Sequence, residues 1–312
     1  MTSEPAPERI LQRLDWHVIR RLDGLLQGDY RTLFRGSGVD LTDLREYQPG
    51  DDVRAIDWNV TARTDVPHVR EYAEDRDLTA WFLLDFSPSV DFGTVPEERR
   101  KRTVLIDFVT TLARLLTRRG NRVGAIFYGQ RVERTLPAGS GRLQVLQLIQ
   151  AMQRQPIAAR APLTDLNLLL EAGHRAVKRR SLVFVISDFI GAEGWERSLD
   201  LLNRRHAVMA VRLVDPREQS LPDVGALILE DSETGEQVYV DTADRRFRER
   251  FAVAALAREA AISTAFARAG VEAVTLSTDE DLVRAIVRMA TLRHRRRGPA
   301  ATTGVPGAPR AA

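Results

Sequence analysis

The pattern of hydrophobic and polar positions becomes regular near residue 78. From there, apolar segments of strand length alternate with segments whose apolar side chains recur every three or four residues. The segment LTAWFLLDF (78–86) is apolar almost throughout, as expected of a strand that is covered on both faces. Residues 97–119 carry one apolar stripe at helical spacing, which predicts an amphipathic helix.

The same alternation continues to residue 292. Further strands are predicted at 121–128, 131–137 (a hairpin edge), 181–187, 206–214 and 271–277, and further helices at about 141–153, 165–178, 194–204, 243–269 and 279–292. Strands that alternate with helices predict an α/β fold, with a doubly wound, mostly parallel sheet and helices on both faces. Residues 225–242 interrupt this order with two alternating runs around a Thr-Gly turn, which predicts an inserted β-hairpin.

The two ends of the chain differ from this central part. Residues 9–27 have the period of a helix, whereas 28–75 are highly charged and rich in turn residues, which favours loops and short strands. We expect residues 1–75 to form an accessory segment packed on a main domain of 76–292. The last residues, 293–312, are rich in Arg, Gly, Pro and Ala and are predicted to be a disordered tail.

The composition narrows the possible chemistry. The chain has 312 residues, 44% of them hydrophobic and 29% charged, and it has no cysteine, which excludes disulfides and thiolate metal sites. Its five histidines have no ligand spacing, which argues against a zinc site. The net charge is +3, but positive and negative residues are interleaved, which favours a solvated surface over a nucleic-acid interface. Lysine occurs only at 101 and 178, and arginine supplies the other basic residues.

The hydropathy of the chain also bears on its location. The N-terminal segment is polar and lacks the apolar core of a signal peptide. No window approaches the ~20 apolar residues that a membrane-spanning helix requires. We therefore expect a soluble, cytoplasmic protein.

Oxygen-bearing side chains stand at the ends of predicted strands. Asp85 lies at the end of the strand 78–86, and Ser87 and Ser89 follow that strand. Asp188 follows the strand 181–187, and Thr164 precedes a predicted helix. Ligands of doubly wound sheets bind beyond the carboxyl ends of the strands. Carboxylate and hydroxyl oxygens suit a hard divalent cation such as Mg²⁺, or alternatively Mn²⁺. The spacing therefore predicts a divalent-metal site with a position left open for an outside oxygen.

Each of these residues also has a purely structural interpretation. Asp85, Ser87 and Ser89 could cap the next helix, and Thr164 could be the N-cap of the helix 165–178. Asp188 could simply be a polar residue that ends a strand.

The D-x-S-x-S spacing, followed by Thr164 and Asp188, resembles the metal-ion-dependent adhesion site of von Willebrand factor A domains. The resemblance implies that Asp85, Ser87 and Ser89 form the first metal loop, Thr164 the second and Asp188 the third. It also implies that a carboxylate of a bound partner takes the open position on the metal. Thr164 lies in PLTDL, which departs from the Gly-Gly-Thr-Asp-Leu of the family.

Residues 36–72 resemble the hallmark segment of domain-of-unknown-function family 58, which precedes a von Willebrand A-like domain. The likeness is carried by Leu44-Arg45-Glu46-Tyr47, Pro49-Gly50-Asp51-Asp52, Ile56-Asp57-Trp58, Ala62-Arg63 and Val69-Arg70-Glu71-Tyr72. The resemblance implies an adaptor or co-chaperone that works with a MoxR-type AAA+ ATPase in the assembly or activation of other proteins. The block 44–63 itself has two interpretations, a docking surface or a charged scaffold in which arginines pair with aspartates to brace the metal loop.

An enzyme is the main alternative. A metal-dependent phosphohydrolase could use Asp85 as phosphoryl acceptor, but the general acid expected two residues later is replaced by Ser87, which cannot transfer a proton near neutral pH. The chain also lacks a Gly-rich phosphate loop. We therefore predict a non-enzymatic, divalent-metal-dependent protein-binding module that takes a MoxR-type ATPase or a client protein as its partner.

Overall fold

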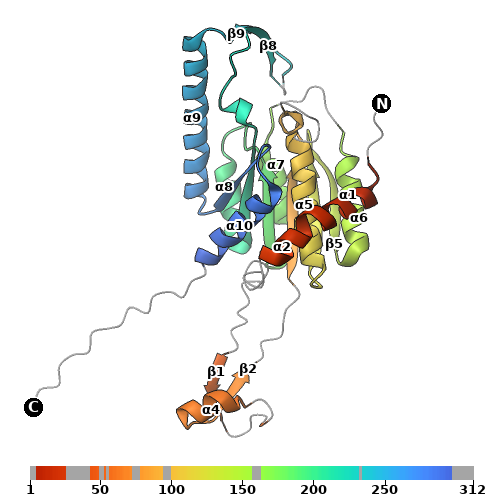
Figure 1. Ribbon diagram of the computed structural model, residues 1–312, viewed down its shortest axis with the longest axis vertical. Helices are drawn as coiled ribbons and strands as arrows, with labels where there is room; N and C mark the ends of the chain where they lie inside the picture. Colours follow the sequence, from red (N-terminus) through yellow and green to blue (C-terminus); the bar gives the residue numbers. More distant parts are fainter. Residues whose placement is uncertain are drawn as a thin grey trace, which may run out of the picture.

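The computed structural model describes residues 5–25, 43–48, 53, 56–71, 78–93, 100–156, 163–231 and 234–296. Within them, six strands form one central sheet (Figure 1). Their order across the sheet is β10 (Glu272–Ser277), β7 (Ala207–Val214), β6 (Leu182–Ser187), β3 (Thr79–Asp85), β4 (Arg122–Tyr128) and β5 (Val132–Gly139). All neighbouring strands are parallel except β4 and β5, which form the predicted hairpin edge.

Helices cover both faces of this sheet. One face carries α5 (Lys101–Thr117), α6 (Gly141–Gln153) and α10 (Leu282–Arg296), and the other carries α7 (Leu166–Ala176), α8 (Trp195–Arg205) and α9 (Arg245–Arg268). Strand β3 sends Phe82 and Leu84 into the first hydrophobic cluster and Leu83 into the second. The predicted doubly wound α/β fold is therefore confirmed.

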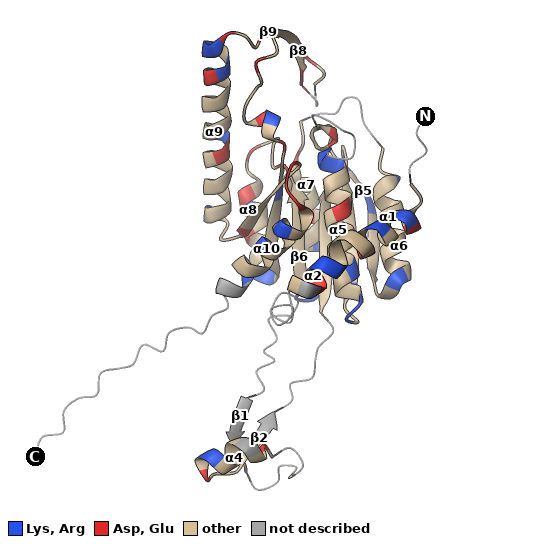
Figure 2. Cartoon of the chain, viewed as in Figure 1, with Lys and Arg blue, Asp and Glu red and all other residues tan. Residues whose placement is uncertain are grey.

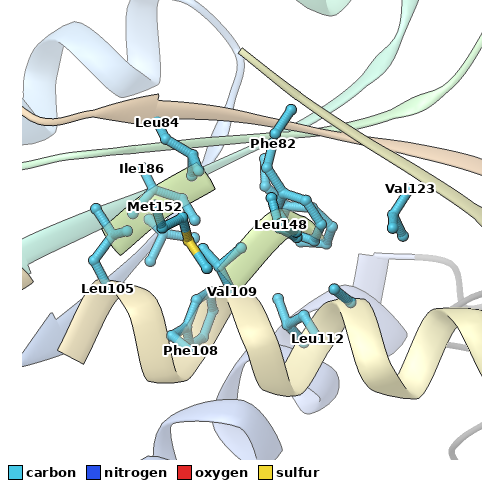
Figure 3. Packing of buried hydrophobic residues seen from close by; sticks show 14 of the residues in the cluster. Phe82, Leu84, Leu105, Phe108, Val109, Leu112, Val123, Leu148, Met152 and Ile186 are labelled. Atoms are coloured by element: carbon cyan, nitrogen blue, oxygen red, sulfur yellow. The ribbon is translucent and has the colours of Figure 1, made fainter. Parts of the chain in front are cut away.

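The core on the α5 face is close-packed (Figure 3). Strand residues Phe82, Leu84 and Ile186 meet Leu105, Phe108, Val109 and Leu112 of α5 and Leu148 and Met152 of α6. The rings of Phe82 and Phe184, on neighbouring strands, stack with centroids 5.4 Å apart. This packing holds the strands whose carboxyl ends carry the predicted metal ligands.

The N-terminal helices pack on the outside of α5. Here α1 (Pro7–Leu14), a π-helical turn (Asp15–Ile19) and α2 (Arg20–Leu25) bury Leu11, Leu14 and Leu22 in the α5-side cluster. Arg13 forms an ion pair with Asp107 of α5. The apolar stripe predicted over 9–27 thus faces the rest of the chain.

A small unit is built from β1 (Asp43–Glu46), β2 (His68–Glu71) and α4 (Trp58–Thr64), with β1 and β2 antiparallel. Helix α4 corrects the prediction that 28–75 holds only loops and short strands. It is capped by Asp57, whose Oδ1 accepts from the Val60 amide, and it is too short for a helical period to show in the sequence. In Figure 1 this unit is joined to the sheet by segments outside the described residues. The predicted packing of the charged segment on the main domain stays a prediction.

Most of the proposed scaffold pairs also fall outside the described residues. These are Asp51, Asp52 and Arg54, together with the side chain of Arg45. Trp58, at the start of α4, is largely exposed.

The inserted hairpin is confirmed as β8 (Ala226–Glu230) paired with β9 (Gln237–Asp241). It follows β7 through a short 3-10 helix, η5 (Pro216–Glu218), and precedes α9, whose N-cap is Asp244. Because β7 runs toward the carboxyl edge of the sheet, η5 and the hairpin leave from the edge where the metal ligands were predicted.

The predicted start of the tail needs a correction. Helix α10 continues to Arg296, and Arg293 is buried. The apolar period ends at 292, but arginine has a high helix propensity and prolongs the helix beyond it. Residues 297–312, the rest of the predicted tail, lie outside the described residues. Among the helices that the structure describes, none combines the length and the apolar character needed to cross a membrane.

We expect Phe184→Ala to lower the free energy of unfolding by about 3–5 kcal/mol, because it removes a fully buried ring and leaves a cavity. Urea denaturation would measure the change. Leu143→Ala is the matched control, since this α6 side chain is 69% exposed and its loss should change stability by less than about 0.5 kcal/mol. Equal effects of the two substitutions would contradict this placement of the core.

Candidate metal centre

Two aspartates lie at the carboxyl ends of adjacent strands. Asp85 is the last residue of β3, and Asp188 directly follows β6. Because β3 and β6 are parallel neighbours, these ends meet at the same edge of the sheet. Both side chains are fully buried. The strand order therefore brings together two carboxylates that are far apart in the sequence.

The loop after β3 directs three oxygen groups to one place. The Ser87 amide donates to Asp85 Oδ1 at 2.9 Å, which closes a tight turn. A four-residue 3-10 helix, η3 (Pro88–Asp91), follows, and Ser87 precedes it without making a side-chain capping bond. Instead, Ser87 Oγ lies 3.1 Å from Ser89 Oγ. The capping interpretation of the two serines is therefore wrong.

Thr164 lies on the second loop and is buried. The N-cap of α7 is Asp165, whose side chain accepts from the Asn167 amide, so the interpretation of Thr164 as the N-cap is wrong. The Thr164 carbonyl accepts from the Ala192 amide at 2.8 Å. Gly191 packs so closely here that a Cβ would lie 2.2 Å from the same carbonyl oxygen. The Thr164 loop thus lies directly against the loop that follows Asp188.

Asp188 begins the third loop. Its Oδ1 accepts from the Ile190 amide at 3.0 Å, and the next residue, Phe189, has a left-handed backbone with φ 57°. The Phe189 ring is fixed by packing on Trp195 and edge-on against Phe266. A residue that merely ended a strand would face solvent, whereas Asp188 is turned inward.

Three further residues complete the centre, and the spacing of the motif did not indicate them. Ser187 Oγ donates to Asp85 Oδ2 at 2.6 Å, so it joins the two strand ends. Lys101, the first residue of α5, is fully buried, and its Nζ donates to Asp188 Oδ2 at 3.0 Å, to the Ser89 carbonyl at 3.3 Å and to Glu218 of η5. One signal for Lys101 did exist, because it is one of only two lysines in an arginine-rich chain. No signal marked Glu218.

Burial and charge shift the pKa values of this cluster. Burial, reinforced by the neighbouring Asp188, raises the pKa of Asp85 to about 7, although hydrogen bonds from Ser187 and Ser87 oppose the rise. Burial alone would lower the pKa of Lys101, but Asp188 and Glu218 outweigh it and raise that pKa above its ordinary value. Lys101 is therefore a permanent cation, whereas Asp85 lacks enough positive charge nearby. In Figure 2, acidic and basic segments meet at the end of α5 where the helix begins.

The donor set fits a hard divalent cation. Octahedral Mg²⁺ with oxygens at about 2.1 Å places neighbouring ligands about 3.0 Å apart, close to the 3.1 Å between Ser87 Oγ and Ser89 Oγ. When all three carboxyls are ionised, Asp85, Asp188 and Glu218 together with the ammonium of Lys101 have a net charge of −2, which one divalent ion balances. The described residues contain no group of three or more His, Cys, Asp or Glu side chains that could hold a metal, so such an ion would depend on hydroxyls and water.

Four of the five histidines lie on described elements that do not form this centre. His17 lies in the N-terminal helical segment, His68 in β2, His174 in the last turn of α7 and His206 at the start of β7, the opposite end of that strand from η5.

The strand order and the helices on both faces are those of a von Willebrand factor A-like α/β fold. The sequence profile of the family described as "Protein of unknown function DUF58" matches residues 43–261, and the chain belongs to this family. The prediction of this family from the segment 36–72 is thereby confirmed.

Relatives extend over nearly the whole chain. It is 37% identical over 293 residues to uncharacterized protein Mb1516 of Mycobacterium bovis, covering 94% of this chain and 92% of that protein. Uncharacterized protein Rv1480 of Mycobacterium tuberculosis matches to the same extent. Among solved structures, BatB from Bacteroides thetaiotaomicron is similar over 70% of this chain and 99% of its own, with 14% identity and a TM-score of 0.46. The SpRpn10 VWA domain covers 68% of this chain and 94% of its own, with 11% identity and a TM-score of 0.39.

We expect Asp85→Asn to stabilise the metal-free protein in a pH-dependent way. The folded-state pKa of Asp85 is raised from 3.8 to about 7, so its contribution to stability is complete below about pH 3.8 and is lost as the pH rises through about 7. The amide never ionises and avoids this loss. In EDTA, the melting temperature of the variant relative to the unsubstituted protein should rise between about pH 4 and pH 7 and then level off. A difference in melting temperature between the two proteins that does not change with pH would contradict the raised pKa of Asp85.

Proposed function

We propose that this protein is a non-enzymatic, divalent-metal-dependent protein-binding module. Mg²⁺, or alternatively Mn²⁺, is held by Asp85, Ser87, Ser89, Thr164 and Asp188, directly or through water. The observation that carries the proposal is the pair of converging serine hydroxyls beside two buried carboxylates whose cluster has a net charge of −2.

The ligand types favour binding to an outside carboxylate. Ser87, Ser89 and Thr164 offer neutral oxygens, so they coordinate a cation without cancelling its charge. Mg²⁺ requires near-octahedral coordination and usually keeps several water ligands. A carboxylate from a partner can replace one of these waters, and the bond it forms with the ion is stronger because the surroundings are buried. The metal then joins two proteins and is not a reagent.

The contacts around Asp85 support binding over catalysis. A phosphohydrolase that used Asp85 as acceptor would need a general acid nearby, and Ser87 stands where that acid is expected. The Ser87 hydroxyl lies against Ser89 Oγ, and the second carboxylate, Asp188, is engaged by Lys101. Neither group is free to deliver a proton to a leaving group.

The partner we propose is a MoxR-type AAA+ ATPase or a client protein that supplies the carboxylate. Family membership supports this choice, because the resemblance to this family implies a MoxR-type ATPase as the partner. The role would be that of an adaptor or co-chaperone in the assembly or activation of the client.

The test is capture of a purified MoxR-type ATPase from the same organism by the immobilised protein. Capture should occur in Mg²⁺, disappear in EDTA and fall at least ~10-fold in Asp85→Ala, because that variant loses a charged metal ligand. Asp200→Ala is the matched control, since this aspartate lies on α8 and pairs with Arg204. Circular dichroism would verify that both variants fold.

Two results would contradict the proposal. Capture that is indifferent both to EDTA and to Asp85→Ala would remove the metal bridge. Mg²⁺-dependent turnover of phosphate esters that Asp85→Ala abolishes would favour the phosphohydrolase alternative.

A further inference from the structure

Lys101 has an unusual position for a lysine. Its side chain is fully buried, and its ammonium donates three hydrogen bonds to oxygens from three separate segments of the chain. These oxygens belong to Ser89, Asp188 and Glu218. All three donors of the ammonium are therefore used, and the first two acceptors lie on residues of the candidate metal centre.

The ammonium is bound to one of the metal-site carboxylates themselves. Asp188 Oδ2 accepts from Lys101 Nζ at 3.0 Å while its Oδ1 accepts from the Ile190 amide. Lys101 thus neutralises one of the two buried aspartates. Among the described residues, the hydrogen-bond donors to Asp85 are Ser87 and Ser187, and neither is a cation. The charges in this centre are distributed unequally.

We infer that Lys101 is a positioning residue that sets the charge of the metal site and thereby its selectivity for a divalent ion. This inference rests on the proposed metal-binding function. With Lys101 in place, the cluster of Asp85, Asp188 and Glu218 has a net charge of −2, which matches Mg²⁺. Without the ammonium, the net charge is −3, which matches a trivalent ion and holds a divalent one too tightly for easy exchange.

The alternative is a purely structural role for Lys101, in which the side chain acts only as a link between segments (a structural staple). Such a link would only connect the ends of β3 and β6 to η5. Its removal would therefore lower the stability of the fold and weaken the binding of every metal ion by the same factor. The charge-setting role predicts the opposite sign, because removing a positive charge strengthens the binding of any cation. It also predicts a dependence on ionic charge, since the Coulomb energy scales with the charge of the bound ion.

The experiment is a series of charge variants titrated with Mg²⁺ by calorimetry and with Tb³⁺ by luminescence. Lys101→Met keeps the approximate length of the side chain and removes its charge, so the net charge of the cluster becomes −3. Glu218→Gln changes this net charge to −1, and the double variant Lys101→Met/Glu218→Gln restores it to −2. Lys178→Met is the matched control, because it removes the other lysine, which is exposed on the surface.

For Lys101→Met we expect Mg²⁺ to bind at least about 10-fold more tightly and Tb³⁺ about 30-fold more tightly, since the gain in log units scales as the ionic charge. Glu218→Gln should weaken the binding of both ions by a smaller factor, because Glu218 is 21% exposed and its charge is partly screened. The affinities of the double variant for both ions should return toward those of the unsubstituted protein. Lys178→Met should bind both ions with the same affinity as the unsubstituted protein.

The outcomes separate the inference from the proposed function. Unchanged or weaker binding of both ions in folded Lys101→Met, with Mg²⁺ still bound by the unsubstituted protein, would overturn the inference alone. A double variant that stays as perturbed as Lys101→Met would also overturn it, because charge would then not be the controlling quantity. Absence of Mg²⁺ binding by the unsubstituted protein would overturn the metal function and the inference together.

Discussion

Burial of two carboxylates at neighbouring strand ends is the constraint on which the rest of this structure depends. Asp85 and Asp188 are far apart in the chain, but the parallel pairing of β3 with β6 forces them to the same edge. An isolated buried carboxylate is expensive, and two side by side are more so. The surrounding residues are arranged to reduce that cost through the amides of Ser87 and Ile190, the Ser187 hydroxyl and the Lys101 ammonium.

The same compensation links the centre to the periphery. Glu218, the acidic partner of Lys101, belongs to η5, the segment that leads from β7 to the β8–β9 hairpin. On the other side, Arg212 of β7 donates to the Asp188 carbonyl at 3.3 Å and forms an ion pair with Glu259 of α9. The Asp188 loop is therefore contacted by Lys101 of α5 and Arg212 of β7, and these two side chains pair in turn with Glu218 of η5 and Glu259 of α9.

Sequence patterns predicted those parts of the structure that depend on the spacing of apolar residues within one helix or strand. A strand buried on both faces is apolar throughout and a helix carries a stripe, so the sheet, its helices and the hairpin could be predicted. The loop of Asp85, Ser87 and Ser89 could also be predicted, because its three oxygens are close in the chain. The seven-residue helix α4 was missed because it is too short to show a period, and α10 was ended too early because its last turn is built from arginines.

Contacts between distant loops have no such signature. Lys101 and Glu218 are 117 positions apart, and only the order of the strands brings them together. A lysine at a helix start is ordinarily exposed, so its burial could not be foreseen from its neighbours. The cap of α7 is an example at shorter range. Both Thr164 and Asp165 are good N-cap residues, and tertiary packing decided between them by burying Thr164 against Gly191.

The types of the candidate ligands determine how much positive charge a bound cation keeps. If Ser87, Ser89 and Thr164 were carboxylates, the cluster would hold a cation by charge alone and leave it little affinity for a further anion. Neutral hydroxyls supply oxygen without charge, and Lys101 removes one more unit of negative charge from the surroundings. The charge of a divalent ion in this centre is then compensated without an excess of anionic ligands. Such an ion can exchange a water ligand for an outside carboxylate. Under the proposed function, the lysine and the hydroxyls therefore serve one purpose, which is to keep the metal available to a partner.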